Sequence, residues 1–245
     1  MRPTIPIAWA RLSLLTWTVA GVHAARSAYP ANPTLVRDAV YVSSQGLTRF
    51  QRGALEPQWR VVFGIQTLEP VVTRKTVLVG TTRGLCALDP TTGAKRWRIA
   101  SGKTLFPPAV SDSMVYVGGR DGSLRAIALD TGWTIWRRDF RGWIYTPAIV
   151  DGRLAAGGSE GILRGIDARN GDQLWQKTLE QEVVYRPVAV PGGGVVITTF
   201  GAKIVMVNAS TGGTRREVRD ITPSFPPAVH AGRLYFGTFA GSLKA

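Results

Sequence analysis

Short apolar runs separated by turn-forming residues recur along the chain from residue 33 onward. The clearest stretch contains four of them: Pro108 to Val110, Met114 to Val117, Ser123 to Leu129 and Thr134 to Trp136. The gaps hold Asp, Ser, Thr and Gly, which favour tight reversals of the chain. The pattern therefore predicts four short antiparallel strands in each stretch of about 40 residues.

Four markers repeat with one period. A proline opens an apolar run at spacings of 37 to 40 residues, at Pro33, Pro70, Pro108, Pro147, Pro187 and Pro227. A turn glycine recurs at spacings of 38 to 40, at Gly46, Gly84, Gly122, Gly161, Gly201 and Gly241. A later glycine and a tryptophan share this phase, at Gly93, Gly132, Gly171 and Gly212 and at Trp59, Trp97, Trp136 and Trp175.

Repeated units of four strands indicate the blades of a β-propeller. We predict an all-β fold of four-stranded antiparallel blades, five complete and a sixth partial, in a single domain over residues 25–245. Such a sheet must bury its faces against neighbouring blades. The periodic tryptophans are therefore expected to pack between blades.

The second repeat contains Ala87, Asp89, Gly93 and Trp97 at a spacing that resembles the tryptophan-docking motif of pyrroloquinoline-quinone-type propellers. The third and fourth repeats keep most of it, with Ala126, Gly132 and Trp136 in one and Asp167, Gly171 and Trp175 in the other. Ala128 replaces the third aspartate and Gly165 the fourth alanine. The fifth repeat has Asn208 for Asp and Arg216 for Trp, which predicts looser packing of that blade.

This resemblance implies one of two kinds of protein. Quinoprotein dehydrogenases have larger, eight-bladed propellers that hold the quinone and calcium, and they use an adjacent pair of cysteines. This chain has a single cysteine, Cys86. The resemblance therefore favours the other kind, non-catalytic scaffolds similar to the propeller of the outer-membrane β-barrel assembly machine. We expect no enzymatic activity and no cofactor, with a truncated or divergent quinoprotein that binds the quinone and calcium as the alternative.

Composition narrows the chemistry further. One cysteine and two histidines exclude an internal disulfide and a Cys/His metal cluster. Cys86 shares its repeat phase with Arg125, Arg164 and Lys244, so we expect it to be partly exposed. The formal charge of +14 is compatible with an acidic partner or with a solvated basic surface. The charges stand singly, so we expect no specific nucleic-acid partner.

The N-terminus resembles a secretory signal. Arg2 and Arg11 precede an apolar stretch from Leu12 to Val22, and Ala24 ends a small-residue cleavage site. We predict a signal peptide over residues 1–24 and a periplasmic or secreted protein, with no cysteine there for lipid attachment. The alternative is that the segment around Trp17 is a strand of the fold.

Candidate binding residues stand two positions before each repeat proline. Aromatic side chains occupy four of these positions, at Phe106, Tyr145, Tyr185 and Phe225. Because the proline-led strand is expected to be innermost, these side chains could surround one mouth of the central channel, together with Trp143 and Arg186. The two interpretations are interblade packing and an aromatic platform for a peptide or apolar ligand, with Arg186 as its anion anchor. No catalytic residue is predicted.

The last repeat is about 20 residues short of a full one. Three explanations are open. The chain is a fragment of a longer, eight-bladed protein, or a partner or second copy completes the open blade by strand addition, or an uncleaved N-terminal segment around Trp17 completes it. Envelope proteins are the expected partners.

Overall fold

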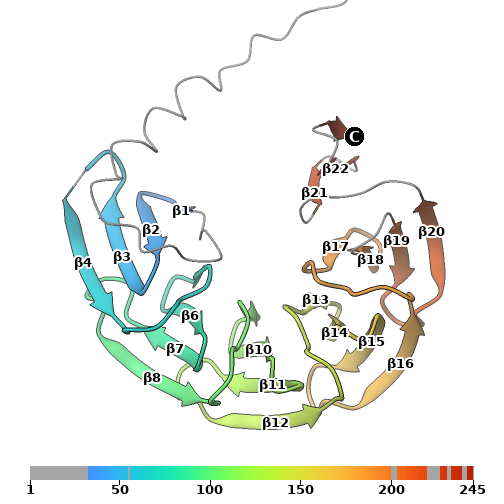
Figure 1. The fold of residues 1–245 in the computed structure, drawn as a ribbon, viewed down its shortest axis with the longest axis horizontal. Coiled ribbons are helices and arrows are strands. Elements are labelled where there is room, and N and C mark those ends of the chain that lie inside the picture. The colour runs from blue at the N-terminus through green and yellow to red at the C-terminus, as the bar shows by residue number, and fades with distance from the viewer. Residues whose placement is uncertain are drawn as a thin grey trace, which may run out of the picture.

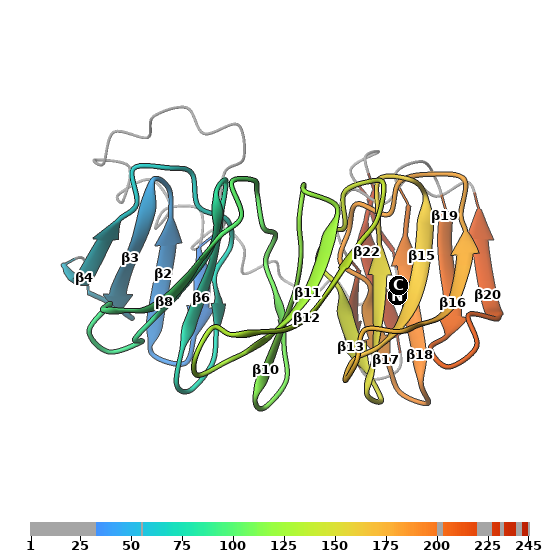
Figure 2. The same cartoon turned by 90° about the horizontal axis from the view of Figure 1, so that it is seen from below.

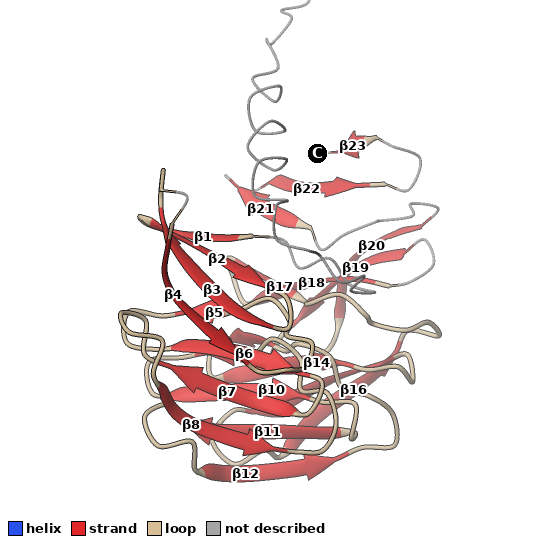
Figure 3. Cartoon of the chain, turned by 60° about the vertical axis from the view of Figure 1, so that its left-hand side comes forward, coloured by secondary structure: helices blue, strands red, loops and turns tan. Residues whose placement is uncertain are grey.

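The computed structural model describes residues 33–54, 56–199, 203–219, 227–230, 233–238 and 242–244. These residues form strands and connecting turns, with no helix among them (Figure 3). They accordingly include no helix long and apolar enough to cross a membrane. The predicted signal peptide and Phe225 lie outside the described residues.

Each of the first three blades is a sheet of four consecutive antiparallel strands. Blade one contains β1 (Thr34–Val36), β2 (Ala39–Ser43), β3 (Gly46–Gln51) and β4 (Pro57–Val62). Blade two contains β5 (Val71–Val72), β6 (Val77–Thr81), β7 (Gly84–Leu88) and β8 (Lys95–Ala100). Blade three contains β9 (Ala109–Val110), β10 (Met114–Gly118), β11 (Ser123–Ala128) and β12 (Thr134–Asp139).

The next two blades repeat this order, and the sixth sheet has three described strands. Blade four contains β13 (Ala148–Val150), β14 (Arg153–Gly157), β15 (Ile162–Asp167) and β16 (Gln173–Thr178). Blade five contains β17 (Val188–Val190), β18 (Gly194–Thr198), β19 (Lys203–Asn208) and β20 (Thr214–Arg219). Blade six contains β21 (Ala228–His230), β22 (Arg233–Gly237) and β23 (Leu243–Lys244).

The six sheets stand in an arc around a common centre, with the first strand of each blade innermost and the fourth outermost (Figure 1). Seen from below, the inner strands run along the axis of the arc, and the outer strands β8 and β12 lie obliquely, as the twist of a sheet requires (Figure 2). The prediction of a propeller with five complete blades and a partial sixth is confirmed. The strands predicted in the third repeat are also confirmed, with β12 three residues longer than expected.

A bulge interrupts the pairing of the third and fourth strands in every complete blade. In blade three, Ala126 pairs with Trp136 and Ile127 with Thr134, so Ile135 is the extra residue. The same shift falls at equivalent positions in the other four blades. A bulge bends the strand and increases its twist. In blades one to four the extra residue lies directly before the repeat tryptophan, where the outer strand approaches the next blade.

Apolar side chains from facing sheets form a separate core between each pair of neighbouring blades. Between blades three and four, for example, Tyr116, Leu124 and Trp136 pack with Leu154 and Ile166. Among the described residues, the cluster between blades five and six has Val196, Ile204 and Phe236 as its buried members, fewer than the other clusters have. Arg216 stands where a tryptophan would otherwise add to it.

Candidate functional site

Two faces of the propeller carry different loops. On one, which we call the mouth face, the turn between the second and third strands bonds to the loop that leads into a first strand. Arg120 N donates to Thr104 O at 2.8 Å, and Ile144 N donates to Gly119 O at 3.1 Å. On the opposite face the turn after each first strand lies beside the turn after a third strand, as where Ala168 N donates to Gly152 O at 3.1 Å.

Three of the predicted aromatic residues lie together on the mouth face. The ring centroids of Phe106 and Tyr145 are 5.0 Å apart, and those of Trp143 and Tyr145 are 6.4 Å apart at an interplanar angle of 81°. Both distances suit tilted and edge-to-face aromatic pairs. Tyr145 is 8% exposed whereas Trp143 is 41% exposed, so the cluster has a buried base and one accessible ring.

Both the main chain and the exposed ring of Trp143 have partners. Its main-chain N–H donates to Ser159 Oγ at 2.9 Å, and its main-chain oxygen accepts from Ser159 N at 3.0 Å. The guanidinium carbon of Arg120 lies 4.4 Å from the Trp143 ring centroid. Such cation–π stacking is favourable at exposed sites. Sequence reasoning missed Arg120, since the segment Arg120-Asp121-Gly122 predicts no more than a turn.

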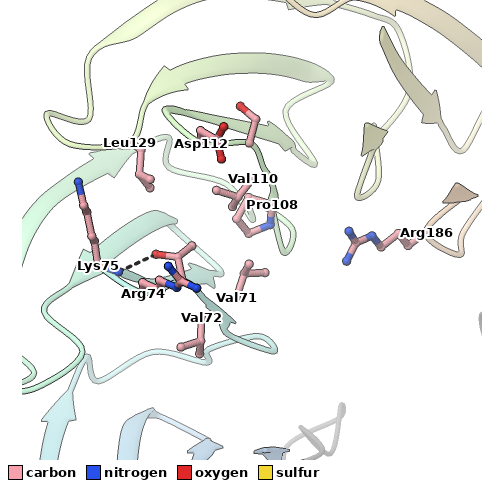
Figure 4. A pocket seen from close by; sticks show the side chains of 11 residues that line it. Val71, Val72, Arg74, Lys75, Pro108, Val110, Asp112, Leu129 and Arg186 are labelled. Atoms are coloured by element: carbon pink, nitrogen blue, oxygen red, sulfur yellow. Dashed lines mark hydrogen bonds between the residues drawn. The ribbon is translucent and has the colours of Figure 1, made fainter. Parts of the chain in front are cut away.

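Tyr185 and Arg186 precede β17 of blade five. Tyr185 is half-buried, and that burial raises the pKa of its phenol. Arg186 lines a cavity of about 510 Å³ beside the inner strands of blades two and three, together with Arg74 and Lys75 (Figure 4). Of the candidate residues, the structure therefore joins Phe106, Trp143 and Tyr145 in one cluster, and places Arg186 at a cavity.

The repeat tryptophans reach from each blade onto the next. Their indole N–H groups donate at 2.8 to 3.1 Å to main-chain oxygens, Trp59 to Pro90, Trp97 to Leu129, Trp136 to Ala168 and Trp175 to Ala209. An added Cβ at the facing glycine would lie 2.6 to 2.8 Å from the docked ring, at Gly93, Gly132, Gly171 and Gly212. Within its own sheet, Ala87 pairs with Trp97. The glycine is thus needed because the ring of the preceding blade occupies the space of a side chain.

The aspartates of the same segment organise its turn. Asp89 Oδ1 accepts from the main-chain N–H groups of Thr91 and Thr92 at 2.8 and 2.9 Å, and Asp89 Oδ2 accepts from Arg96 at 2.7 Å. The hydrogen bond from Arg96, followed by those from Thr92 and Thr91, holds the pKa of Asp89 well below its usual range. Asp167 Oδ1 accepts from Arg169 N in the same way at 2.8 Å.

The expected exposure of Cys86 is wrong, because Cys86 is only 2% exposed. Its repeat phase faces the neighbouring blade and is buried in blades three and four as well. Arg125 and Arg164 occupy it there because each is paired with a carboxylate four residues earlier, Asp121 and Glu160 respectively. A buried charge needs such a partner, and a thiol does not. Burial raises the pKa of the Cys86 thiol.

The adjacent pair of cysteines that the resemblance to the dehydrogenases implies has no counterpart in this sequence. Cys86 is the single cysteine, and it is buried. Within the described ranges no three His, Cys, Asp or Glu residues are grouped as a metal site would require.

Comparison with solved structures identifies propellers of several kinds. BamB from Moraxella catarrhalis is 21% identical, with a TM-score of 0.65 over 84% of this chain and 69% of that one. The quinohemoprotein alcohol dehydrogenase ADHIIG from Pseudomonas putida HK5 is 15% identical, with a TM-score of 0.63 over 83% of this chain and 44% of that one. A chain of a mitotic checkpoint complex is 15% identical, with a TM-score of 0.69 over 82% and 67%. At these identities the likeness shows the fold alone.

Comparison by sequence identifies a family of repeat propellers. No curated protein matches the chain. A family model described as outer membrane protein assembly factor BamB matches residues 47–243, which include the docked tryptophans and the aromatic cluster. The chain therefore belongs to the family of pyrroloquinoline-quinone-type repeat propellers that is represented by the outer membrane protein assembly factor BamB.

Proposed function

We propose that this protein is an exported, non-catalytic scaffold that binds other proteins of the cell envelope through the mouth face of its propeller. The observation that carries this proposal is Trp143, a large aromatic side chain that is 41% exposed although its ring contacts Tyr145 and Arg120 and its main chain is bonded to Ser159. Because the ring is already ordered, a partner that covers it loses little side-chain entropy on binding. Tryptophans and arginines of this kind dominate the energy of protein interfaces.

Two further observations support the proposal. The matching family is described by a factor in outer membrane protein assembly. The chain of the mitotic checkpoint complex that shares the fold is part of an assembly of proteins. The sequence of residues 1–24 has the features of a secretory signal, which supports a periplasmic or secreted location.

The aromatic cluster has a structural use as well as a binding use. Phe106 leads into blade three and Tyr145 into blade four, so their contact at 5.0 Å also packs the two blades together. We therefore assign partner contact to Trp143 and Arg120, with Phe106 and Tyr145 as the support beneath them.

Affinity capture from an envelope extract of the source organism tests this function. Trp143→Ala should lower the recovery of a saturable partner at least tenfold, the usual effect of truncating an interface hot spot. Trp133→Ala is the matched control, since Trp133 is 75% exposed but lies in the turn between β11 and β12, on the opposite face. Equal recovery by the two variants, with unchanged circular dichroism, would refute a binding role for the mouth face.

A role in quinone chemistry would give a different result. Under that alternative, protein mixed with pyrroloquinoline quinone and calcium would bind the quinone stoichiometrically and show its absorbance. We expect no such binding, because the chain lacks the adjacent cysteines that the dehydrogenases use.

A further inference from the structure

The central channel contains a cavity that is distinct from the aromatic cluster. Its volume is about 510 Å³, and it lies along the innermost strands β5 and β9 of blades two and three. Val71, Pro108, Val110 and Leu129 give it an apolar wall (Figure 4). Cavities of roughly 300 to 1,000 Å³ with such walls are typical of sites for small ligands or a few residues of peptide.

The charged groups that line this cavity are mainly cations. Arg74 and Lys75 stand at the turn after β5, and Arg186 extends toward them from the segment before β17 of blade five (Figure 4). Asp112 is the one carboxylate among the described residues of the lining, and these residues, with three cations, carry a formal charge of +2. The cations come from two blades that are far apart in sequence, and they converge on one space.

These cations differ from the arginines of blades three and four. Arg125, Arg138 and Arg164 each form an ion pair with a carboxylate at 3.0 Å or less. By contrast, Arg74, Lys75 and Arg186 take part in none of the ion pairs found between described residues. The charge at the cavity is therefore available to a ligand.

The distribution of charge among the blades points the same way. Residues 67–104 of blade two carry seven Lys or Arg and two acidic residues, and residues 184–219 of blade five carry five and one. Residues 144–183 of blade four carry four Lys or Arg and six acidic residues. The two most basic blades are those that contribute the cations of the cavity, and a cavity with an excess of one charge concentrates the field on an oppositely charged ligand.

We propose that this cavity binds a ligand that carries a carboxylate beside apolar groups, namely an acidic peptide segment. The apolar side chains rest against Val71, Val110 and Leu129, and the carboxylate accepts hydrogen bonds from Arg186 and Arg74. Arginine suits this role because its planar guanidinium can bind a carboxylate through two parallel hydrogen bonds. The choice of a peptide as the source rests on the proposed scaffold function, whereas the carboxylate chemistry does not.

Titration calorimetry with three probes tests the site on the full chain. The probes are the peptide acetyl-Leu-Glu-Val-Glu-amide, the same peptide with Gln in place of Glu, and free glutarate. We expect the Glu peptide to bind at least tenfold more tightly than the Gln peptide, since a charge-assisted hydrogen bond contributes about that factor. Arg186→Gln and Arg74→Gln should each weaken the Glu peptide about tenfold.

Arg169→Gln is the matched control, because it removes the same charge from an exposed turn of blade four that does not line the cavity. It should change the affinity by less than about twofold, as expected for a distant and screened charge. Equal binding of the Glu and Gln peptides would overturn the proposal. Equal weakening by Arg169→Gln and Arg186→Gln would also overturn it, because the attraction would then come from the overall charge.

Glutarate identifies the source of the carboxylate. If glutarate binds and Arg186→Gln weakens that binding, the site is one for a free dicarboxylate. If only the peptide binds, the site is one for a peptide. Both results support the carboxylate site. This inference and the proposed function fail separately. The inference fails if Arg186→Gln leaves peptide binding unchanged, and the proposed function fails if Trp143→Ala leaves partner capture unchanged.

Discussion

Replacing Gly171 by alanine should destabilise the protein mainly through the tryptophan of the preceding blade. Gly171 has a φ of 77°, and an added Cβ would lie 2.7 Å from the Trp136 ring. The positive φ alone costs an alanine about 1 to 2 kcal/mol. The ring must also move, which weakens its burial and the 3.0 Å bond from Trp136 Nε1 to Ala168 O. We therefore expect a total loss of about 3 to 5 kcal/mol in the free energy of unfolding.

Gly152→Ala separates the two contributions. Gly152 lies in the same blade with a φ of 71°, and an added Cβ there would meet nothing within 4 Å. This variant should lose only about 1 to 2 kcal/mol. Trp136→Ala alone should cost about 4 to 5 kcal/mol, because the side chain is 7% exposed and buries roughly 200 Å². In that background Gly171→Ala should cost no more than Gly152→Ala, which gives a coupling energy of about 2 to 3 kcal/mol.

Equilibrium urea unfolding measures these differences, and coincident near- and far-ultraviolet circular dichroism transitions establish that one unfolding step is being compared. The reasoning is refuted if Gly171→Ala and Gly152→Ala lower the stability equally, or if the two substitutions at Gly171 and Trp136 are additive.

Three other predictions follow from buried or paired groups. Asp121→Asn should destabilise the protein by about 2 to 4 kcal/mol, because it leaves Arg125, whose side chain is 6% exposed, without its counter-charge. Asp139→Asn removes one partner of an exposed ion pair and should cost under about 1 kcal/mol. Urea unfolding midpoints compare the two variants, and equal losses of stability would contradict the distinction. The Cys86 thiol should react with Ellman's reagent only on unfolding, since it is buried and its pKa is raised; rapid labelling of the native protein would show that blades one and two do not cover it. Finally, the pKa of Asp89 is lowered in the fold, so ionised Asp89 stabilises the protein above about pH 4, and this stabilisation is lost as the pH falls below that value. Asp89→Asn should therefore make the decline in stability below about pH 4 shallower. Thermal midpoints of the variant that fall in parallel with those of the wild type from about pH 5 to 2 would argue against this.

The repeat made the blade architecture predictable, because turn glycines and apolar runs are local features of the chain. The bulge before each tryptophan was not predictable in this way. Extra residues such as Arg96 and Ile135 show their role only when the third and fourth strands are paired. It is this pairing that places the tryptophan against the next blade, and the spacing from Gly93 to Trp97 does not reveal it.

The features of the candidate site that the sequence did not predict depend on burial and on contacts between residues distant in sequence. Cys86 shares its phase with two arginines, which suggests exposure, yet those arginines are buried with carboxylates. The proline phase correctly located Phe106 and Tyr145 before neighbouring inner strands, and their ring contact depends on how the two blades pack. The stacking of Arg120 on Trp143 joins two loops, and Arg186 and Arg74 line one cavity although they come from two blades distant in sequence.

Site-specific photo-cross-linking at position 143 tests the central claim most directly, namely that the mouth face binds another protein. Benzoylphenylalanine replaces Trp143 in one variant and the more exposed control Trp133 in another, and both are irradiated with envelope proteins. The account predicts one discrete adduct at position 143 that excess unlabelled protein competes away, and none at position 133. The same set of adducts at both positions, or none at position 143, would contradict it.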